Sequence, residues 1–138
     1  MKHRVRPLAL LALIASGCGV PSLLDKIDAE SEKSVDIVCS CSNVFPDRGM
    51  CEAMFFSPFS FFDRDCLEEA LETDKESSKA TLKCILDNAR EYNKCLEDRL
   101  DCNDAQSFSG CEPNFTDDCP ELPPAVEEQA SACGATTD

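Results

Sequence analysis

The sequence is poor in the residues on which most enzyme sites depend. Its only histidine is His3, beside the N-terminus, and the chain has no tryptophan and one tyrosine. Without a histidine in the body of the chain, Ser-His-Asp and Cys-His catalytic arrangements are excluded. The five glycines are scattered along the chain, which excludes a glycine-rich phosphate loop. No apolar run reaches the roughly 20 residues that a transmembrane helix needs.

Carboxylates are the catalytic groups that remain. The chain has 27 Asp and Glu residues, so pairs at any given spacing occur by chance and spacing nominates none of them as acid or base. We therefore expect a protein that is not an enzyme and has no catalytic residue, no cofactor and no metal. A small secreted hydrolase that depends on carboxylates is the alternative from another class.

The first 17 residues have the three parts of an export signal. Cationic Lys2, Arg4 and Arg6 come first, apolar residues 8–14 follow, and small residues occupy 15–17. The signal carries three of the 13 basic residues, so its removal leaves 10 against 27 acidic ones, a formal charge of −17. Such a surface repels nucleic acid and anionic headgroups, and we expect no nucleic-acid partner.

The end of this segment, Ala-Ser-Gly-Cys at residues 15–18, resembles the lipobox of bacterial lipoproteins. Ala15 stands where Leu is usual, and the resemblance covers only the first 18 residues. It implies cleavage after Gly17, a lipid on Cys18 and a membrane as partner through that lipid. Gly19 after the lipid cysteine favours the outer membrane over the inner membrane of a bacterial envelope. We therefore expect a lipid-anchored envelope protein that acts as a binding or structural module. The alternative is a secreted acidic toxin or inhibitor without lipid.

Cysteine is abundant, with 11 in the chain. One is Cys18, and the other ten form an even set that predicts five disulfides made in an oxidising compartment. No two of them have the Cys-x-x-Cys spacing, which argues against thioredoxin-like redox chemistry and zinc ribbons. The predicted disulfide cysteines are Cys39, Cys41, Cys51, Cys66, Cys84, Cys95, Cys102, Cys111, Cys119 and Cys133.

Helical patterns predict a small all-α domain of about four helices with an irregular C-terminal region. The first expected helix covers 22–38, and the second covers 47–56 with Asp47 as N-cap. Asp65 and Glu68 have the capping-box spacing, which predicts a helix from Asp65 to about Glu72. A polar break is expected at 73–77, a long helix at 78–102, and a short last helix at 126–132. We expect a lipidated N-terminal tether at 18–22, the disulfide-linked helical domain at 23–133 and a disordered tail at 134–138.

The long helix places three cysteines along one edge of its apolar face. At about 100° per residue, Cys84, Cys95 and Cys102 point in nearly the same direction, and the about 10–16 Å between neighbours is too long for a disulfide. Each must therefore bond to a different segment. If the chain reverses near Lys75, Cys66 faces Cys84, which is the best predicted pair.

The same symmetry sets Cys51 opposite Cys95, and Cys39 or Cys41 opposite Cys102. Cys111, Cys119 and Cys133, with whichever of Cys39 and Cys41 is left, complete the last two predicted bridges.

Four further motifs have competing interpretations. The run 54–62 holds five of the eight phenylalanines, either as a partner-binding aromatic patch around Phe59 or, as we favour, as core. The segment 101–112 begins with Asp and ends with Glu like a calcium loop, but Gln106 replaces the required glycine, so we expect no calcium there. We interpret the acidic group Asp117, Asp118 and Glu121 as solvated side chains rather than as a cation site. The sequence Asn-Phe-Thr at 114–116 is a glycosylation sequon that matters only in a eukaryote.

Overall fold

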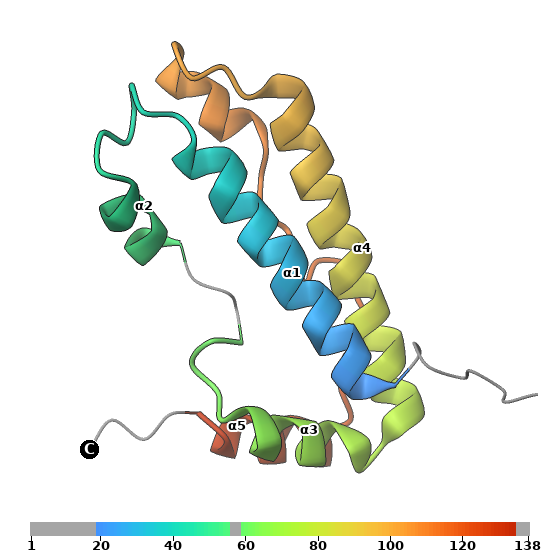
Figure 1. Ribbon diagram of the computed structural model, residues 1–138. Coiled ribbons are helices and arrows are strands. Elements are labelled where there is room, and N and C mark those ends of the chain that lie inside the picture. The colour runs from blue at the N-terminus through green and yellow to red at the C-terminus, as the bar shows by residue number, and fades with distance from the viewer. Residues whose placement is uncertain (1–18, 56–58, 135–138) are drawn as a thin grey trace, which may run out of the picture.

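The described part of the chain, residues 19–55 and 59–134 of a computed structural model, is helical and has no strand (Figure 1). Its elements in chain order are α1 (Val20–Cys39), α2 (Arg48–Met54), α3 (Arg64–Glu72), α4 (Lys75–Arg99), the 3-10 helix η1 (Ala105–Gly110) and α5 (Pro124–Ala132). The predicted small, disulfide-rich all-α fold is therefore confirmed. The expected helix at 126–132 corresponds to α5, and η1 was not predicted.

Two long helices form the spine of the molecule. α1 and α4 lie side by side over most of their length, and the shorter α3 and α5 lie across one end of the pair (Figure 1). α1 buries Leu24 and Ile27, which lie about one helical turn apart on one face, and α4 buries Leu82, Ile85 and Leu86 toward it. The amphipathic pattern thus explains why these two helices pair.

Three aspartates begin three of the helices. The side chains of Asp47, Asp63 and Asp74 accept hydrogen bonds from the backbone N–H groups three residues on, at Met50, Cys66 and Ser77. The N-cap predicted at Asp47 is confirmed. The N-cap predicted at Asp65 is wrong, because Asp63 caps α3 and Asp65 lies in its first turn. The polar break predicted at 73–77 covers only Thr73 and Asp74, since the Asp74 cap lets α4 begin at Lys75.

The N-terminal end of the described chain contains no tether. Val20 opens α1 and is completely buried, and the Leu23 N–H already donates to the Gly19 carbonyl at 3.1 Å. Pro21 favours this start, because proline is well tolerated in the first helical turn. The prediction that residues 20–22 belong to a tether is therefore wrong. Residues 1–18, with Cys18 among them, and the tail at 135–138 lie outside the described residues.

The larger of the two apolar cores, the base core, lies where α3 and α5 cross the ends of α1 and α4. It consists almost entirely of aliphatic side chains, with Cys133 as the single buried cysteine. Its buried members are Val20, Leu23, Leu24, Ile27, Leu67, Ala70, Leu71, Leu82, Ile85, Leu86, Val126, Ala130 and Cys133.

The smaller core, the upper core, lies at the other end of the spine between α1, α2, α4 and η1. Three of its five buried members are cysteines, namely Cys39, Cys51 and Cys111, and the others are Val38 and Leu96. Partly buried Phe45, Tyr92 and Phe108 pack around them.

A buried polar junction separates the two cores along the spine. Asn93 on α4 is 1% exposed, and its amide donates to the carbonyl and to the carboxylate of Glu30 on α1, both at 2.8 Å. Ser34 on α1 donates to the Asn93 amide oxygen at 2.6 Å. Arg90 approaches the same Glu30 carboxylate at 3.5 Å. These bonds satisfy the buried amide, which would otherwise destabilise the helix pair.

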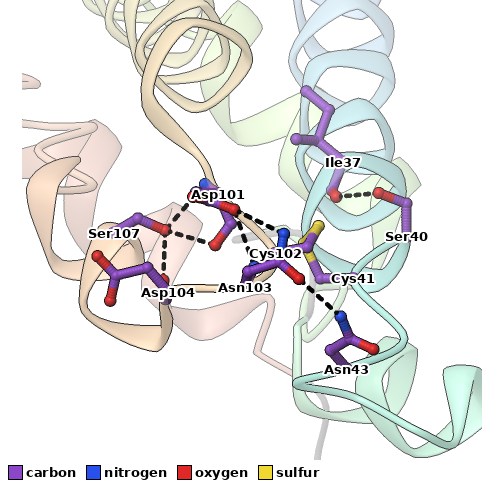
Figure 2. Close-up of a disulfide and its surroundings, with 9 residues drawn as sticks. All are labelled: Ile37, Ser40, Cys41, Asn43, Asp101, Cys102, Asn103, Asp104 and Ser107. Atoms are coloured by element: carbon purple, nitrogen blue, oxygen red, sulfur yellow. Dashed lines mark hydrogen bonds between the residues drawn. A yellow bond between two sulfur atoms is a disulfide. The ribbon is translucent and has the colours of Figure 1, made fainter.

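All ten cysteines of the even set are paired. The bridges are Cys39–Cys51, Cys41–Cys102, Cys66–Cys133, Cys84–Cys119 and Cys95–Cys111. Of the two options weighed for Cys102, the partner is Cys41. Figure 2 shows this bridge joining the turn after α1 to the loop after α4, where Asn43 also donates to Asn103 at 3.1 Å. Next to it, the Ser107 hydroxyl accepts from the Asp101 N–H at 3.0 Å.

The predicted bridge between Cys66 and Cys84 is wrong. α3 and α4 do not fold back on each other as an antiparallel pair, because α4 packs along α1 while α3 runs across the base beside α5 (Figure 1). Cys66 therefore meets Cys133 at the end of α5, with Cα atoms 5.6 Å apart. The Asp63 N–H donates to the Cys133 carbonyl at 2.9 Å and fixes the same contact.

In the predicted cysteine ladder, the pairing of Cys102 with one of Cys39 and Cys41 is confirmed, and the other pairings are wrong. Cys51 bonds to Cys39 instead of facing Cys95, because α2 packs beside α1. α4 ends at Arg99, so Cys102 lies in the loop beyond the helix. The two cysteines that are on α4, Cys84 and Cys95, bond to Cys119 and Cys111 and so tie the irregular C-terminal segment onto the helix.

Candidate functional site

An apolar hollow of about 240 Å³ opens on the upper half of the molecule, and we call it the Tyr92 groove. α1 contributes one wall, the end of α2 a second, and α4 with the segment after η1 a third. Its lining residues are Ser31, Ser34, Val35, Val38, Met54, Phe55, Tyr92, Pro113 and Phe115.

The wall from α2 is fixed by a disulfide and by one arginine. The Cys39–Cys51 bridge attaches α2 to the end of α1 with Cα atoms 5.7 Å apart. Arg48, at the start of α2, pairs with Asp36 on α1 and with Glu52 at 2.6 Å. α2 is thereby held beside α1 although it buries only Cys51.

The residues at the end of α2 present apolar surface to solvent. Met54 is 63% exposed and Phe55 is 37% exposed. The Phe55 ring meets the edge of Phe45 at a centroid distance of 5.9 Å, and Phe45 meets Phe108 at 5.8 Å in the same way. Phe55 is therefore oriented by aromatic packing while part of its surface stays accessible.

Tyr92 forms the opposite side of the groove. Its ring packs edge-to-face against Phe115 at a centroid distance of 5.4 Å. Asn88, one turn earlier on α4, donates to the backbone carbonyls of Phe115 at 3.1 Å and Asp117 at 3.2 Å and so holds that segment in place. Burial raises the pKa of the Tyr92 hydroxyl above its ordinary value, because the phenolate would lose hydration.

Carboxylates flank the groove on two sides. A hollow of about 330 Å³ shares Ser31, Val35 and Phe55 with it and adds Glu32, Asp36 and Glu52. A second hollow of about 350 Å³ shares Tyr92 and adds Glu91, Glu112, Asp117 and Asp118. Among the described residues, none that lines any of these three hollows is Lys or Arg. The result is an apolar centre between acidic sides.

The aromatic run expected at 54–62 is divided by the fold. Phe59 and Phe62 are partly buried against the base core, whereas Phe61 is 59% exposed. Phe55 belongs to the Tyr92 groove, at the other side of the gap in the described chain. Residues 56–58 lie outside the described residues. The residue at the centre of the predicted patch, Phe59, is thus tied to the core, as the favoured interpretation expected.

The acidic motifs do not converge on a common centre. Asp101 accepts from the Asn103 backbone N–H at 2.9 Å, and Asp104 caps η1 by accepting from the Gln106 N–H at 2.9 Å. These residues shape the loop of Figure 2. Within residues 19–55 and 59–134, no cluster of three or more His, Cys, Asp or Glu side chains has the geometry to hold a metal ion. Asn114 of the sequon is exposed.

Sequence reasoning did not find the Tyr92 groove. Its residues come from four separate segments, and no local spacing connects Val35 with Tyr92 or Phe115. The one available signal was Tyr92 itself, which the helical rotation placed at the border of the apolar face of α4. A lone tyrosine at such a border more often completes a core than lines a binding surface.

None of the helices in the described part of the chain is both long and apolar enough to span a bilayer. Comparison of the chain with protein-family models, with curated proteins and with solved structures found no match in any of the three. Its five disulfides indicate an oxidising environment, outside the cell or in the envelope.

Proposed function

We propose that the chain is an exported binding module, held to the outer membrane of a bacterial envelope by a lipid on Cys18 and acting through non-covalent contacts rather than catalysis. The observation that carries the proposal is the odd number of cysteines. Ten of the 11 cysteines pair with one another, and the one left over stands at the end of the lipobox-like segment. An odd cysteine in an exported chain calls for a separate role.

The helical domain supports a binding role. Its disulfides and two cores make a rigid scaffold, and the exposed Met54 and Phe55 are apolar side chains at the rim of a hollow on that scaffold. Accessible apolar surface bordered by polar groups is characteristic of interaction sites. The structure offers less support for the hydrolase alternative, because Glu91, Glu112, Asp117 and Asp118 around the acidic hollow beyond Tyr92 are all exposed. A general acid ordinarily needs a more desolvated setting.

Intact mass of the protein purified from a bacterial host, before and after reduction, tests the proposal. We expect loss of residues 1–17, a mass increment of a diacylglyceryl group on Cys18, and uptake of ten hydrogen atoms when five disulfides are reduced. A Cys18→Ser variant is the matched control, because it keeps all five bridges. It should leave the membrane fraction and carry no lipid.

The same measurement identifies the alternative. A mature chain that lacks the lipid increment and is recovered without membranes would overturn the anchoring and favour the secreted toxin or inhibitor. A sixth cysteine pair, formed between two copies through Cys18, would give a dimer that reduction splits, and this too would contradict a lipid on Cys18.

A further inference from the structure

We propose that the Tyr92 groove binds a basic amphipathic helical segment of a partner protein, with a bulky apolar side chain in the groove and Lys or Arg side chains on both sides of it. This inference rests on the proposed binding function and names the chemistry of the partner. Three features of the surface support it, namely the size of the groove, the exposure of its apolar rim, and the charge around it.

The size of the groove suits side chains of a protein better than a whole small molecule. Its volume of about 240 Å³ lies below the range of about 300–1,000 Å³ that is usual for small-molecule sites. Val35, Val38 and Phe115 form its apolar lining, and Ser31 and Ser34 use their hydroxyls within the helix and the polar junction. One or two bulky apolar side chains would fill such a space.

The rim consists of exposed apolar side chains. Met54 projects from the end of α2 with 63% of its surface exposed, and methionine is common at surfaces that bind amphipathic helices because it is flexible and polarizable. Phe55 beside it offers an aromatic face. The described residues have no open sheet edge to which a strand could be added, and an apolar groove between helices suits the helix-in-groove mode of peptide binding.

The charge around the groove selects a basic partner. Glu32, Asp36 and Glu52 lie on one side, and Glu91 and Glu112 lie on the side beyond Tyr92. Arg48 compensates Asp36 and Glu52 in part, whereas the second side has no Lys or Arg among its lining residues. Charge complementarity of this kind raises association rates and rejects acidic competitors. It also disfavours an anionic lipid surface or a nucleic acid as the occupant.

The composition of the chain provides a local reporter of binding. Tyr92 is the only tyrosine and there is no tryptophan, so tyrosine emission comes from the groove alone. The probe is a synthetic peptide of about 14 residues, roughly 20 Å long as a helix, made of Leu and Lys in an amphipathic pattern with one Trp on the apolar face. Energy transfer from Tyr92 to this Trp reports occupancy of the groove.

The experiment uses the oxidised full chain carrying Cys18→Ser, so that no lipid or detergent competes for the peptide. We expect saturable quenching of Tyr92 emission by the Leu/Lys peptide, and weaker binding as salt screens the carboxylates. A peptide with Glu in place of every Lys should not bind, nor should a scrambled peptide of the same composition.

Two pairs of variants distinguish binding in the groove from non-specific binding elsewhere on the surface. Met54→Ser should weaken binding about tenfold or more, as loss of an apolar anchor does, whereas Met50→Ser, equally exposed on the same helix but outside the groove, should not. Glu32→Lys should weaken binding more than Glu69→Lys, which makes the same charge change at an exposed position of α3 far from the groove lining. Circular dichroism verifies that each variant keeps its helices.

Equal binding of the acidic and basic peptides, or equal losses for Met54→Ser and Met50→Ser, would overturn the proposal. Binding that is absent altogether would do the same. None of these results bears on the lipid at Cys18, because the intact-mass measurement reads that separately. Conversely, a chain without lipid can still bind the peptide, so the two proposals fail independently.

Discussion

The two ends of the helical spine are stabilised by different chemistry. The base core buries 13 residues, of which 12 are aliphatic and one is a cysteine, and so it resembles the interior of an ordinary globular domain. The upper core buries five, of which three are cysteines, and three of the five bridges lie there. Burial of apolar surface stabilises the base directly, whereas cross-links restrict the unfolded chain at the upper end. The groove belongs to the cross-linked end.

The difference teaches why a small domain needs so many bridges. α2 has seven residues and buries only Cys51, so apolar burial alone would not keep it in place. Disulfides let that end carry exposed side chains such as Met54 without a large core beneath them. The base, by contrast, has enough buried aliphatic surface to hold two crossing helices. Selective damage to either end should therefore have separable effects.

The largest effect is expected from removing the bridge that closes the upper end. Replacing Cys41 and Cys102 together by Ala opens a loop with a sequence separation of 61, which should lower the free energy of unfolding by about 2–5 kcal/mol. The Cys39–Cys51 bridge still holds α2 in this variant, so native-state hydrogen exchange should show the amides at the C-terminal ends of α1 and α4, which the lost bridge joined, losing protection first.

Replacing Cys66 and Cys133 by Ala is the matched control, because their sequence separation of 67 gives a loop of nearly the same length. A similar loss of stability is expected, but the C-terminal ends of α1 and α4 should keep their protection. Uniform loss of protection along the whole chain in both variants would show that the two ends unfold as one unit and would contradict the comparison.

A cavity in the base core should act on the whole molecule. Leu24 is completely buried among aliphatic neighbours, so Leu24→Ala should lower the free energy of unfolding by about 2–5 kcal/mol in a denaturant titration. Leu96→Ala, at an equally buried site in the upper core, should mainly speed exchange near that core, where bridges limit the opening. If Leu96→Ala proved more damaging to α3 than Leu24→Ala, the division into two cores would be untenable.

The polar junction between the cores gives a smaller effect. Asn93→Ala removes the bonds to Ser34 and Glu30 at a cost of about 1–3 kcal/mol, while the Ser34 hydroxyl still donates to the Glu30 carbonyl and Arg90 still meets the Glu30 carboxylate. Arg90→Ala is the control, because Arg90 meets the same Glu30 from an exposed position, where an ion pair contributes about 0–1 kcal/mol. Thermal denaturation of both variants measures the difference, and equal losses would argue against a structural role for the buried amide.

The smallest effect concerns the pH dependence of the upper end. Burial raises the pKa of Tyr92 above 10.0, so the folded state keeps the phenolic proton at a pH where the unfolded state loses it. The stabilisation is fully present below the unfolded pKa and is lost as pH rises through the folded one. Because Tyr92 is the only tyrosine, ultraviolet absorbance should show one transition, displaced upward from its position in denaturant.

Tyr92→Phe removes the titrating hydroxyl and should abolish this contribution to the alkaline loss of stability. Coincident titrations in the folded and unfolded protein would mean that the Tyr92 hydroxyl is solvated in the groove. The measurement thus reports directly how closed the Tyr92 groove is.

Local patterns predicted the helices well, because caps and periodicity act over a few residues. Asp47 was recognised as a cap, and the apolar repeat placed α1 and α4 within a few residues of their ends. The capping-box spacing to Glu68 pointed to Asp65 as the cap, yet Glu68 instead pairs with Arg64 at 2.7 Å. The same Arg64 contacts Asp25 and Asp28 of α1, which no local rule reveals.

Disulfide connectivity resisted prediction because it depends on the angle between helices. An antiparallel α3 and α4 would have paired Cys66 with Cys84, but only two residues, Thr73 and Asp74, join these helices, and α3 turns away to lie along α5. The partner of Cys66 is consequently 67 residues away. The groove was missed for the same reason, since packing between distant segments brings Val35 and Phe115 together.

If Cys18 carries the proposed lipid, the start of α1 fixes how far the domain stands from the membrane. Only Gly19 separates the helix from Cys18, so in the proposed anchored form no flexible linker lies between the lipid and the domain. From Val20 to Val35 the helix rises about 22 Å at about 1.5 Å per residue. The base core therefore lies at the N-terminal end of α1 and the groove lies toward its C-terminal end. In the anchored form, a binding partner therefore reaches the groove at a distance from the lipid that the length of α1 determines.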